Sequence, residues 1–432
     1  MPRLLLACTA ILVALAPAAA QAQGGPALSI PQQQLDAALQ CPASLAGASR
    51  APVLLVPGTN LEPRANYDWN YEPALTAAKI PWCAVELPRY AMGDIQDSAE
   101  YVVAALRRMG AESERRVSIV GFSQGGMIGR WALRWWPDTR ALVEDLVGLA
   151  PSNHGTLTAR PACAAQCPAA YWQQTDTAQF IKALNSGPET FAGIDYTVAF
   201  TRDDEVVTPN ADAQTGSSAL RTGDGRISNT RIQDVCPNDT ADHLVLGSYD
   251  PVGWALALDA LTHDGPADPA RLDPAAICAQ PFMPGVDPAA FPANWGRYLA
   301  AVGEGSRQAE QVGAEPPLKC YAAGTWADGG AGAPGSGAPG AGAGGTSGAP
   351  GTSRRCASRR RFTIHLARRL RRARVTIGAR RVKVRRRGGR LTAIVDLRGR
   401  PAGTVRVRIR GVTRRGRRVT SSRRYRLCAT RR

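Results

Sequence analysis

Residues 117–126 have the sequence VSIVGFSQGG, in which Ser123 stands at the centre of a Gly-x-Ser-x-Gly pentapeptide. The β-branched run before the serine predicts a strand, and the apolar segment at residues 127–136 predicts a helix. A strand, a sharp turn and a helix in this order form a nucleophile elbow, whose glycines let the chain turn tightly and expose the serine hydroxyl. The pentapeptide occurs once in the chain, and with its flanks it predicts a serine hydrolase.

Apolar runs on either side of this elbow predict a buried sheet. Four runs are predicted to be strands: residues 53–56, 118–120, 146–150 and 196–200. Helical patterns between them, as at residues 94–109 and 126–136, favour a mainly parallel sheet that is covered on both faces. The predicted fold class is therefore α/β, of the α/β-hydrolase kind, in which functional side chains follow the carboxyl ends of strands.

Composition divides the 432 residues into four parts. Residues 1–22 are predicted to be a secretory signal, because Arg3, an apolar run at 4–16 and a small-x-small site at 20–22 follow one another. Residues 27–326 would form the hydrolase domain, and residues 354–432 an arginine-rich module. The Gly/Ala/Pro/Ser-rich stretch between them, residues 327–353, cannot bury a core and is predicted to be a flexible linker. The mature protein is expected to be secreted.

The net charge of +18 conceals an asymmetry between the two bodies. Residues 354–432 contain 31 Lys and Arg side chains against one acid, Asp396, which gives +30. The rest of the chain carries 22 basic and 34 acidic side chains, which gives −12. An acidic body and a basic body are therefore joined in one chain.

Ten cysteines are consistent with export, since disulfides persist outside the cytoplasm. Removal of Cys8 with the signal would leave nine, so one thiol is unpaired or bridges two chains. The chain has no Cys-x-x-Cys pair and no His-rich tract. We therefore expect no metal site, and hydrolysis by a serine needs no cofactor.

The acid of a Ser, Asp/Glu, His series should follow Ser123 in the sequence. Asp203, Asp204 and Glu205 come directly after the strand predicted at residues 196–200, and each has suitable spacing. Acidic side chains in such a loop commonly face water. The residues alone do not choose among the three.

Four histidines are candidates for the general base. His365 lies in the basic body, and His154 precedes the acids and so breaks the expected order. His263 follows the helix predicted at residues 254–261. His243 follows the acids and lies in a loop before that helix, so order and context favour it.

Acyl transfer also needs hydrogen-bond donors for the oxygen that becomes negatively charged. One donor is the backbone N–H of the residue after the nucleophile, Gln124. The second comes from the loop after an early strand, where Thr59 offers both an N–H and a hydroxyl. The loss of one such donor typically lowers the rate by about 10²–10³.

With these residues assigned, the acidic body resembles the Candida antarctica lipase B family of α/β-hydrolases. The resemblance rests on ordered blocks at residues 35–37, 53–59, 123–126, 150–151, 172–175, 204–205, 235–236 and 242–243. It implies Ser123 as nucleophile, Asp204 as acid and His243 as base. It also implies an oxyanion hole formed by Thr59 and Gln124.

The resemblance further implies disulfides Cys41–Cys83 and Cys236–Cys278. Cys163 and Cys167 lie where it places a mobile lid, and a bridge between them would stiffen that lid; two unrelated thiols are the alternative. Cys320 has no evident partner in this body.

Two positions depart from the family. Phe122 stands before the nucleophile, where the best-known member has a tryptophan that lines the alcohol pocket. The sequence Ser-Asn-His at residues 152–154 stands where members carry an acid. The preferred size and stereochemistry of the alcohol are therefore left open.

Apolar and arginine residues alternate in the basic body at residues 362–366, 382–384 and 405–410, with turn signals at 388–389 and 401–403. This pattern predicts a small antiparallel β-sandwich that Cys356 and Cys428 could close. The module resembles arginine-rich, immunoglobulin-like modules at the C-termini of exported actinobacterial proteins.

The expected substrate is a lipid or another ester, and the predicted activity is that of a secreted serine esterase or triacylglycerol lipase acting as a monomer. An anionic surface polymer or a membrane is the expected partner of residues 354–432; a solvated charged face without a ligand is the alternative. Nucleic acid is disfavoured, because Phe362 and Tyr425 are the only aromatic residues there. Two other functions fit the sequence: an inactive hydrolase-like protein that binds the cell envelope, and a polyester or wall-glycan esterase.

Overall fold

The computed structural model describes residues 24–327 and, in the basic body, residues 361–365, 370–377, 380–387, 390–397, 403–413 and 418–427. The chain divides into two compact units, Met1–Ala333 and Pro334–Arg432. The predicted signal, Cys356, Cys428 and nearly all of the predicted linker lie outside the described residues.

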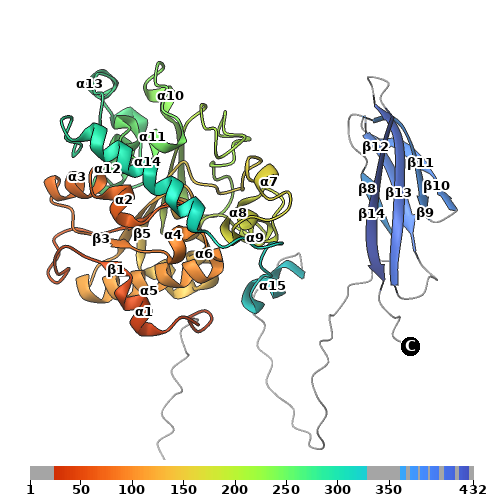
Figure 1. Ribbon diagram of the computed structural model, residues 1–432, viewed down its shortest axis with the longest axis horizontal. Helices are drawn as coiled ribbons and strands as arrows, with labels where there is room; N and C mark the ends of the chain where they lie inside the picture. Colours follow the sequence, from red (N-terminus) through yellow and green to blue (C-terminus); the bar gives the residue numbers. More distant parts are fainter. Residues whose placement is uncertain are drawn as a thin grey trace, which may run out of the picture. The chain divides into compact units, whose positions relative to one another are not determined.

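The first unit is built on a seven-stranded sheet with the order β1-β3-β2-β4-β5-β6-β7 (Figure 1). β1 pairs antiparallel with β3, and the other neighbouring strands pair in parallel. The strands are β1 (Leu39–Gln40), β2 (Val53–Val56), β3 (Trp82–Val85), β4 (Val117–Phe122), β5 (Val143–Leu149), β6 (Asp195–Phe200) and β7 (Arg226–Arg231). The four predicted strands correspond to β2, β4, β5 and β6, which confirms the predicted α/β fold class with a mainly parallel sheet.

Helices pack on both faces of this sheet, and the side chains of β2 show why its sequence is continuously apolar. Leu54 and Val56 belong to a core cluster with residues of α5 and α6, whereas Val53 and Leu55 belong to one with residues of α3 and α12. The α-helices are α1 (Gln32–Ala37), α2 (Pro63–Tyr67), α3 (Tyr71–Ala77), α4 (Pro88–Ala91), α5 (Ile95–Ser113), α6 (Gln124–Trp135), α7 (Ala159–Ala162), α8 (Ala169–Gln174), α9 (Gln179–Leu184), α10 (Ile232–Val235), α11 (His243–Leu246), α12 (Pro251–Thr262), α13 (Pro274–Cys278), α14 (Phe291–Gln308) and α15 (Cys320–Ala327). None of the helices in the described part of the chain is long and apolar enough to cross a bilayer.

The second unit consists of two antiparallel sheets, a four-stranded one with the order β10-β9-β13-β14 and a three-stranded one with the order β11-β12-β8. Their strands are β8 (Arg361–His365), β9 (Leu370–Ile377), β10 (Arg380–Val382), β11 (Val384–Arg387), β12 (Arg390–Asp396), β13 (Gly403–Thr413) and β14 (Arg418–Leu427). Val375 of β9, Ile409 of β13 and Val395 of β12 belong to one buried cluster. The two sheets therefore pack face to face through their apolar sides.

One strand of this unit differs from the prediction. Residues 382–384 were expected to form a single strand, but Lys383 separates β10 from β11, and these two strands pair in different sheets. The chain turns a corner of the sandwich at this lysine, which alternation alone does not reveal because the polar–apolar pattern continues through the corner.

Candidate active site

Ser123 occupies the tight turn between β4 and α6, with φ 53° and ψ −117°. A side chain at Gly121 would lie 2.3 Å from the backbone of Gly125, and one at Gly125 would lie 2.0 Å from the carbonyl oxygen of Val56. Both glycines are therefore required by close backbone contacts. A serine with positive φ is strained, and strain of this kind concentrates at functional turns. The strand, turn and helix predicted around residue 123 are all present.

Asp204 and His243 form a buried pair after the carboxyl end of the sheet. The Nδ1 atom of His243 lies 3.0 Å from Oδ2 of Asp204, and both side chains are almost fully buried. Asp204 Oδ1 accepts hydrogen bonds from the backbone N–H groups of Val206 and Val207 at 3.0 and 2.6 Å. Asn210 donates from Nδ2 to Oδ2 of Asp204 at 3.2 Å. Four N–H groups thus replace the water that this carboxylate loses on burial.

The structure separates the three acids that the sequence left open. Asp203 lies near the surface, 3.6 Å from the side chain of Arg202. Glu205 is exposed and accepts a hydrogen bond from the backbone N–H of His243 at 3.2 Å. Of these acids, Asp204 is the one that contacts the imidazole ring.

The other histidines lie in different surroundings. Nε2 of His154 is 2.7 Å from Glu189, and His263 is half-exposed beside Asp259. His365 belongs to β8 in the second unit. His243 itself was expected in a loop but is the first residue of the short helix α11, where the side chain of Asp242 caps the helix.

A cavity of about 330 Å³ is bordered by three of the five predicted site residues, whereas Asp204 and Gln124 are not among its lining residues. Ser123, His243 and Thr59 all border it, and Phe122 packs against the imidazole with ring centroids 4.9 Å apart and ring planes tilted by 43°. Its remaining lining residues are Asn60, Thr156, Thr158, Ala159, Ala162, Tyr171, Gln174, Val206, Val207, Leu244, Val302 and Ser306. Residues of α7 and α14 therefore line the same cavity as Ser123 and His243.

The hydroxyl of Thr59 is held by two side-chain amides. Nε2 of Gln124 lies 3.1 Å from Thr59 Oγ1 and also donates to the carbonyl of Ala91. Nε2 of Gln174 lies 3.0 Å from the same oxygen and also donates to the carbonyl of Ala170. Since a backbone carbonyl only accepts, these contacts fix both amides with nitrogen toward Thr59. The oxygen accepts two hydrogen bonds, so its proton is left to point elsewhere.

Sequence reasoning missed three residues of this site. Gln174 and Asn210 hold Thr59 and Asp204, and the hydroxyl of Ser152 donates to Gln174 Oε1 at 2.8 Å. Ser152 had been noted only as a departure from the family's acid. No local motif marks such residues, because Gln174 and Thr59 are 115 positions apart in the sequence.

Three disulfides are present in the described part of the chain. Cys41–Cys83 and Cys236–Cys278 confirm the pairings that the resemblance implied. Cys163–Cys167 directly follows α7, and Cys167 forms a β-bridge with Val312. Cys320 is free and exposed.

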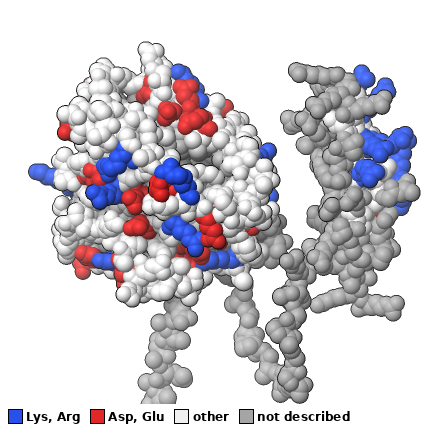
Figure 2. Space-filling view, in the orientation of Figure 1, with Lys and Arg blue, Asp and Glu red and all other residues white. Residues whose placement is uncertain are grey.

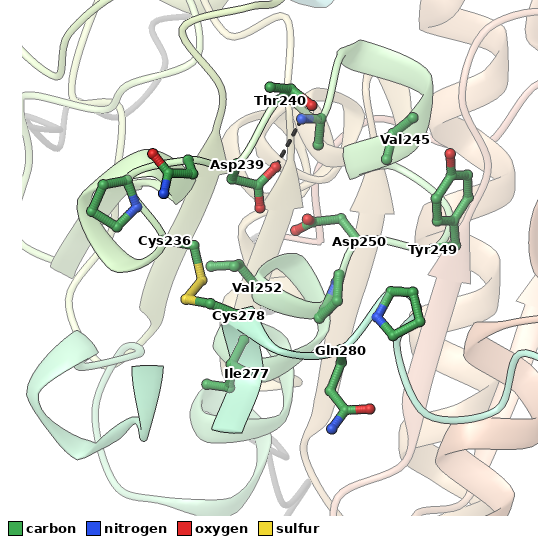
Figure 3. A pocket seen from close by; sticks show the side chains of 15 residues that line it. Cys236, Asp239, Thr240, Val245, Tyr249, Asp250, Val252, Ile277, Cys278 and Gln280 are labelled. Atoms are coloured by element: carbon green, nitrogen blue, oxygen red, sulfur yellow. Dashed lines mark hydrogen bonds between the residues drawn. A yellow bond between two sulfur atoms is a disulfide. The ribbon is translucent and has the colours of Figure 1, made fainter. Parts of the chain in front are cut away.

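A second cavity, of about 440 Å³, borders the segment directly before His243 (Figure 3). The Cys236–Cys278 disulfide lines it, and the carboxyl groups of Asp239 and Asp250 point toward each other there (Figure 3). Burial raises the pKa of Asp250 well above its usual range, and the negative charge of Asp239 adds to the effect. Its described lining residues include no serine and no histidine.

Within the described residues, no group of three or more His, Cys, Asp or Glu side chains is arranged to hold a metal ion.

Two lipases are similar to this chain in sequence or in structure. No family model matches the chain. Lipase B of Pseudozyma antarctica is 32% identical over 223 residues, which are 50% of this chain and 64% of that protein. The chain thus matches slightly less than two thirds of that relative's length. Aspergillus fumigatus lipase B, in its crystal structure, is similar with a TM-score of 0.64 and 31% identity, covering 71% of this chain and 75% of that one.

The seven-stranded sheet and the strand–turn–helix around Ser123 define the first unit as an α/β-hydrolase. Over about half of its length, the chain is a lipase B-like α/β-hydrolase. The resemblance of the second unit to actinobacterial immunoglobulin-like modules stays a prediction.

Proposed function

We propose that the protein is an exported carboxylic-ester hydrolase, with Ser123 as nucleophile, His243 as general base and Asp204 as the acid that orients the histidine. The observation that carries this proposal is the buried 3.0 Å contact between His243 and Asp204, at a cavity that Ser123 also borders. Similarity to two lipases B supports the same class of reaction.

In the proposed reaction, Nδ1 of His243 is engaged with Asp204, which leaves Nε2 to accept the proton of Ser123. The serine oxygen attacks the ester carbonyl, and the imidazolium then protonates the departing alcohol. Water repeats the attack on the acyl-enzyme and releases the acid. The carboxylate of Asp204 stabilises the imidazolium that forms in each half-reaction.

The oxyanion would be bound by the backbone N–H groups of Gln124 and Thr59 and by the hydroxyl of Thr59. Two side-chain amides donate hydrogen bonds to the oxygen of this hydroxyl, so its proton is free to be donated to the oxyanion. Donors that are fixed before the reaction stabilise developing charge without reorganisation.

The expected substrates are esters with an apolar acyl chain, including triacylglycerols. Leu244, Val302 and Ala162 give the cavity apolar walls suited to such a chain. Export is supported by the three disulfides, which are typical of proteins outside the cytoplasm.

Labelling with a fluorophosphonate tests the nucleophile. The wild-type protein should be labelled, and S123A should lose the label while retaining its fold by circular dichroism. Folded wild-type protein that resists labelling would instead favour the inactive, envelope-binding alternative.

Turnover of p-nitrophenyl esters of increasing chain length, together with emulsified triacylglycerol, tests the substrate class. Activity on medium and long chains and on the emulsion is expected for a lipase. Activity confined to acetyl esters would contradict the lipase assignment and favour a wall-glycan esterase.

A further inference from the structure

The four-stranded sheet of the second unit presents an outer face composed of arginines. On β9, Arg372 and Arg374 are exposed and alternate with the cluster residues Ala373 and Val375. On β13, the exposed Arg408 and Arg410 alternate in the same way with the buried Val407 and Ile409. Figure 2 shows Lys and Arg side chains gathered over the described surface of this unit. We call Arg372, Arg374, Arg381, Arg408 and Arg410 the arginine face.

Strand register places four of these arginines in two rows across the sheet, and Arg372 lies in a further row opposite Val412. Arg374 is the direct partner of Arg410. In the next row, Arg381 of β10 pairs with Thr376 of β9, and Thr376 pairs with Arg408 of β13. Directly opposed residues of antiparallel strands lie about 5 Å apart on the same face of the sheet. The guanidinium groups therefore form a two-dimensional array rather than a line.

The four strands of this sheet contain no Asp or Glu that could neutralise the arginine charges. The sole acidic residue between positions 354 and 432, Asp396, lies on β12 of the other sheet, where its register partner is Arg361. Like charges directly opposed across strands are destabilising. Repulsion between Arg374 and Arg410 therefore lowers the stability of this sheet, and a bound anionic partner would offset that repulsion.

The two outer faces of the sandwich differ in the residues that accompany their arginines. The three-stranded sheet carries Asp396 and the 46% exposed Ile394 on its outward positions, beside the exposed Arg385. The arginine face combines its five arginines with the small polar Thr376. The arginine face thus presents a flat array of cations with short polar side chains between them. Such an array is complementary in charge to a flat surface that carries anions.

We propose that the arginine face docks the protein on an anionic phospholipid bilayer. Guanidinium groups bind phosphate oxygens through paired N–H donors, and clustered basic residues are attracted to anionic lipid surfaces. A bilayer presents its headgroups in two dimensions and engages both rows at once, whereas a single linear polyanion would follow one row. The inference goes beyond the proposed hydrolysis and does not depend on it.

Co-sedimentation of the full chain with vesicles tests the docking. Vesicles of phosphatidylcholine with about 30% phosphatidylserine should bind the protein at low salt, and vesicles of phosphatidylcholine alone should not. Binding should weaken as salt is added, because exposed charges are screened. The variant R374Q/R410Q should bind about 25-fold more weakly, from about fivefold per arginine.

The matched control is R385Q/R387Q, which removes the same charge from β11 in the opposite sheet. Packed sheets lie about 10 Å apart, and the Debye length is about 10 Å at 0.1 M salt. The variants are therefore compared in 0.1 M salt, where the control should change binding by less than about twofold. R374K/R410K keeps the charge and should retain most of the binding, which separates loss of charge from loss of fold.

Three outcomes would overturn the proposal: no preference for anionic vesicles, an equal loss in the control variant, or tight binding of inorganic polyphosphate without binding of vesicles. The last result would assign the arginine face to a linear polyanion. S123A should bind vesicles as the wild type does, so a failure of the hydrolase assignment stays distinguishable from a failure of the docking.

Discussion

Asp204 and Asp250 are both buried acids that lie close to the segment at residues 236–243, but different groups surround their carboxyl groups. Asp204 faces the imidazole of His243 and accepts three further N–H hydrogen bonds. Asp250 faces a second carboxyl group, that of Asp239, in the neighbouring cavity (Figure 3). Both side chains have lost nearly all contact with water.

The difference shows what a buried acid needs in order to act in catalysis. Burial disfavours the charged form of a carboxyl group, and only hydrogen-bond donors or a cation offset that cost. Asp204 is supplied with such donors, so it can stabilise a positive charge on His243. Asp250 also accepts a backbone hydrogen bond, from Gly253 at 2.6 Å as the cap of α12, but it faces the carboxyl group of Asp239, and its raised pKa favours the neutral acid.

The largest expected effect is on kcat and distinguishes the role of Asp204 from that of Asp250. D204N should lower kcat for p-nitrophenyl butyrate by about 10⁴-fold, because an amide cannot hold the histidine in its tautomer or stabilise its cation. D250N, the matched change in the other cavity, should leave kcat within about twofold at pH 7. A comparable loss in both variants would break the distinction between the two sites.

The second expected effect concerns the oxyanion hole. T59V keeps the shape of the side chain and its backbone N–H but removes the hydroxyl proton. Loss of one oxyanion donor should lower kcat by about 10²–10³-fold with little change in KM. T59S retains the hydroxyl and serves as the control. If T59V were as active as T59S, the hydroxyl would have no part in the reaction.

The strands could be predicted because β2, β4, β5 and β6 are covered on both faces and their sequences are almost continuously apolar. The elbow could be predicted because two glycines are required by backbone contacts at Ser123. Chain order was enough to favour His243. These features are local or follow from the order of residues along the chain.

Other features depend on tertiary contacts and left no local pattern. Spacing alone could not distinguish Asp203 from Asp204, since adjacent residues point in different directions and the turn decides which one faces inward; the choice of Asp204 came from the resemblance to the lipase B family. Gln174 and Asn210 are ordinary amides until the fold brings them to Thr59 and Asp204. Structure was needed to find the contacts of Gln174 and Asn210.

A third prediction tests Gln174 as a positioning residue. Q174L removes one of the two amides that hold the Thr59 hydroxyl, so the hydroxyl proton should lose its fixed direction. We expect kcat to fall about fivefold, since one neutral hydrogen bond contributes on the order of 1 kcal/mol, with KM unchanged. In a T59V background the same substitution should cost almost nothing, because residues that act through one group are not additive. Equal losses in both backgrounds would assign Gln174 a purely structural role.

The smallest expected effect concerns stability around Asp250. Its pKa is raised in the folded protein, mainly by burial, above the value of about 3.9 in an unfolded chain. Stability from the protonated acid is therefore complete below about pH 4 and is lost as the pH rises through the folded-state pKa. D250N mimics the neutral acid and escapes this loss, so its Tm relative to wild type should rise by roughly 2 °C or more between pH 5 and pH 8. A Tm difference that stays constant over this range would show that Asp250 is already ionised and that its surroundings, like those of Asp204, stabilise the charge.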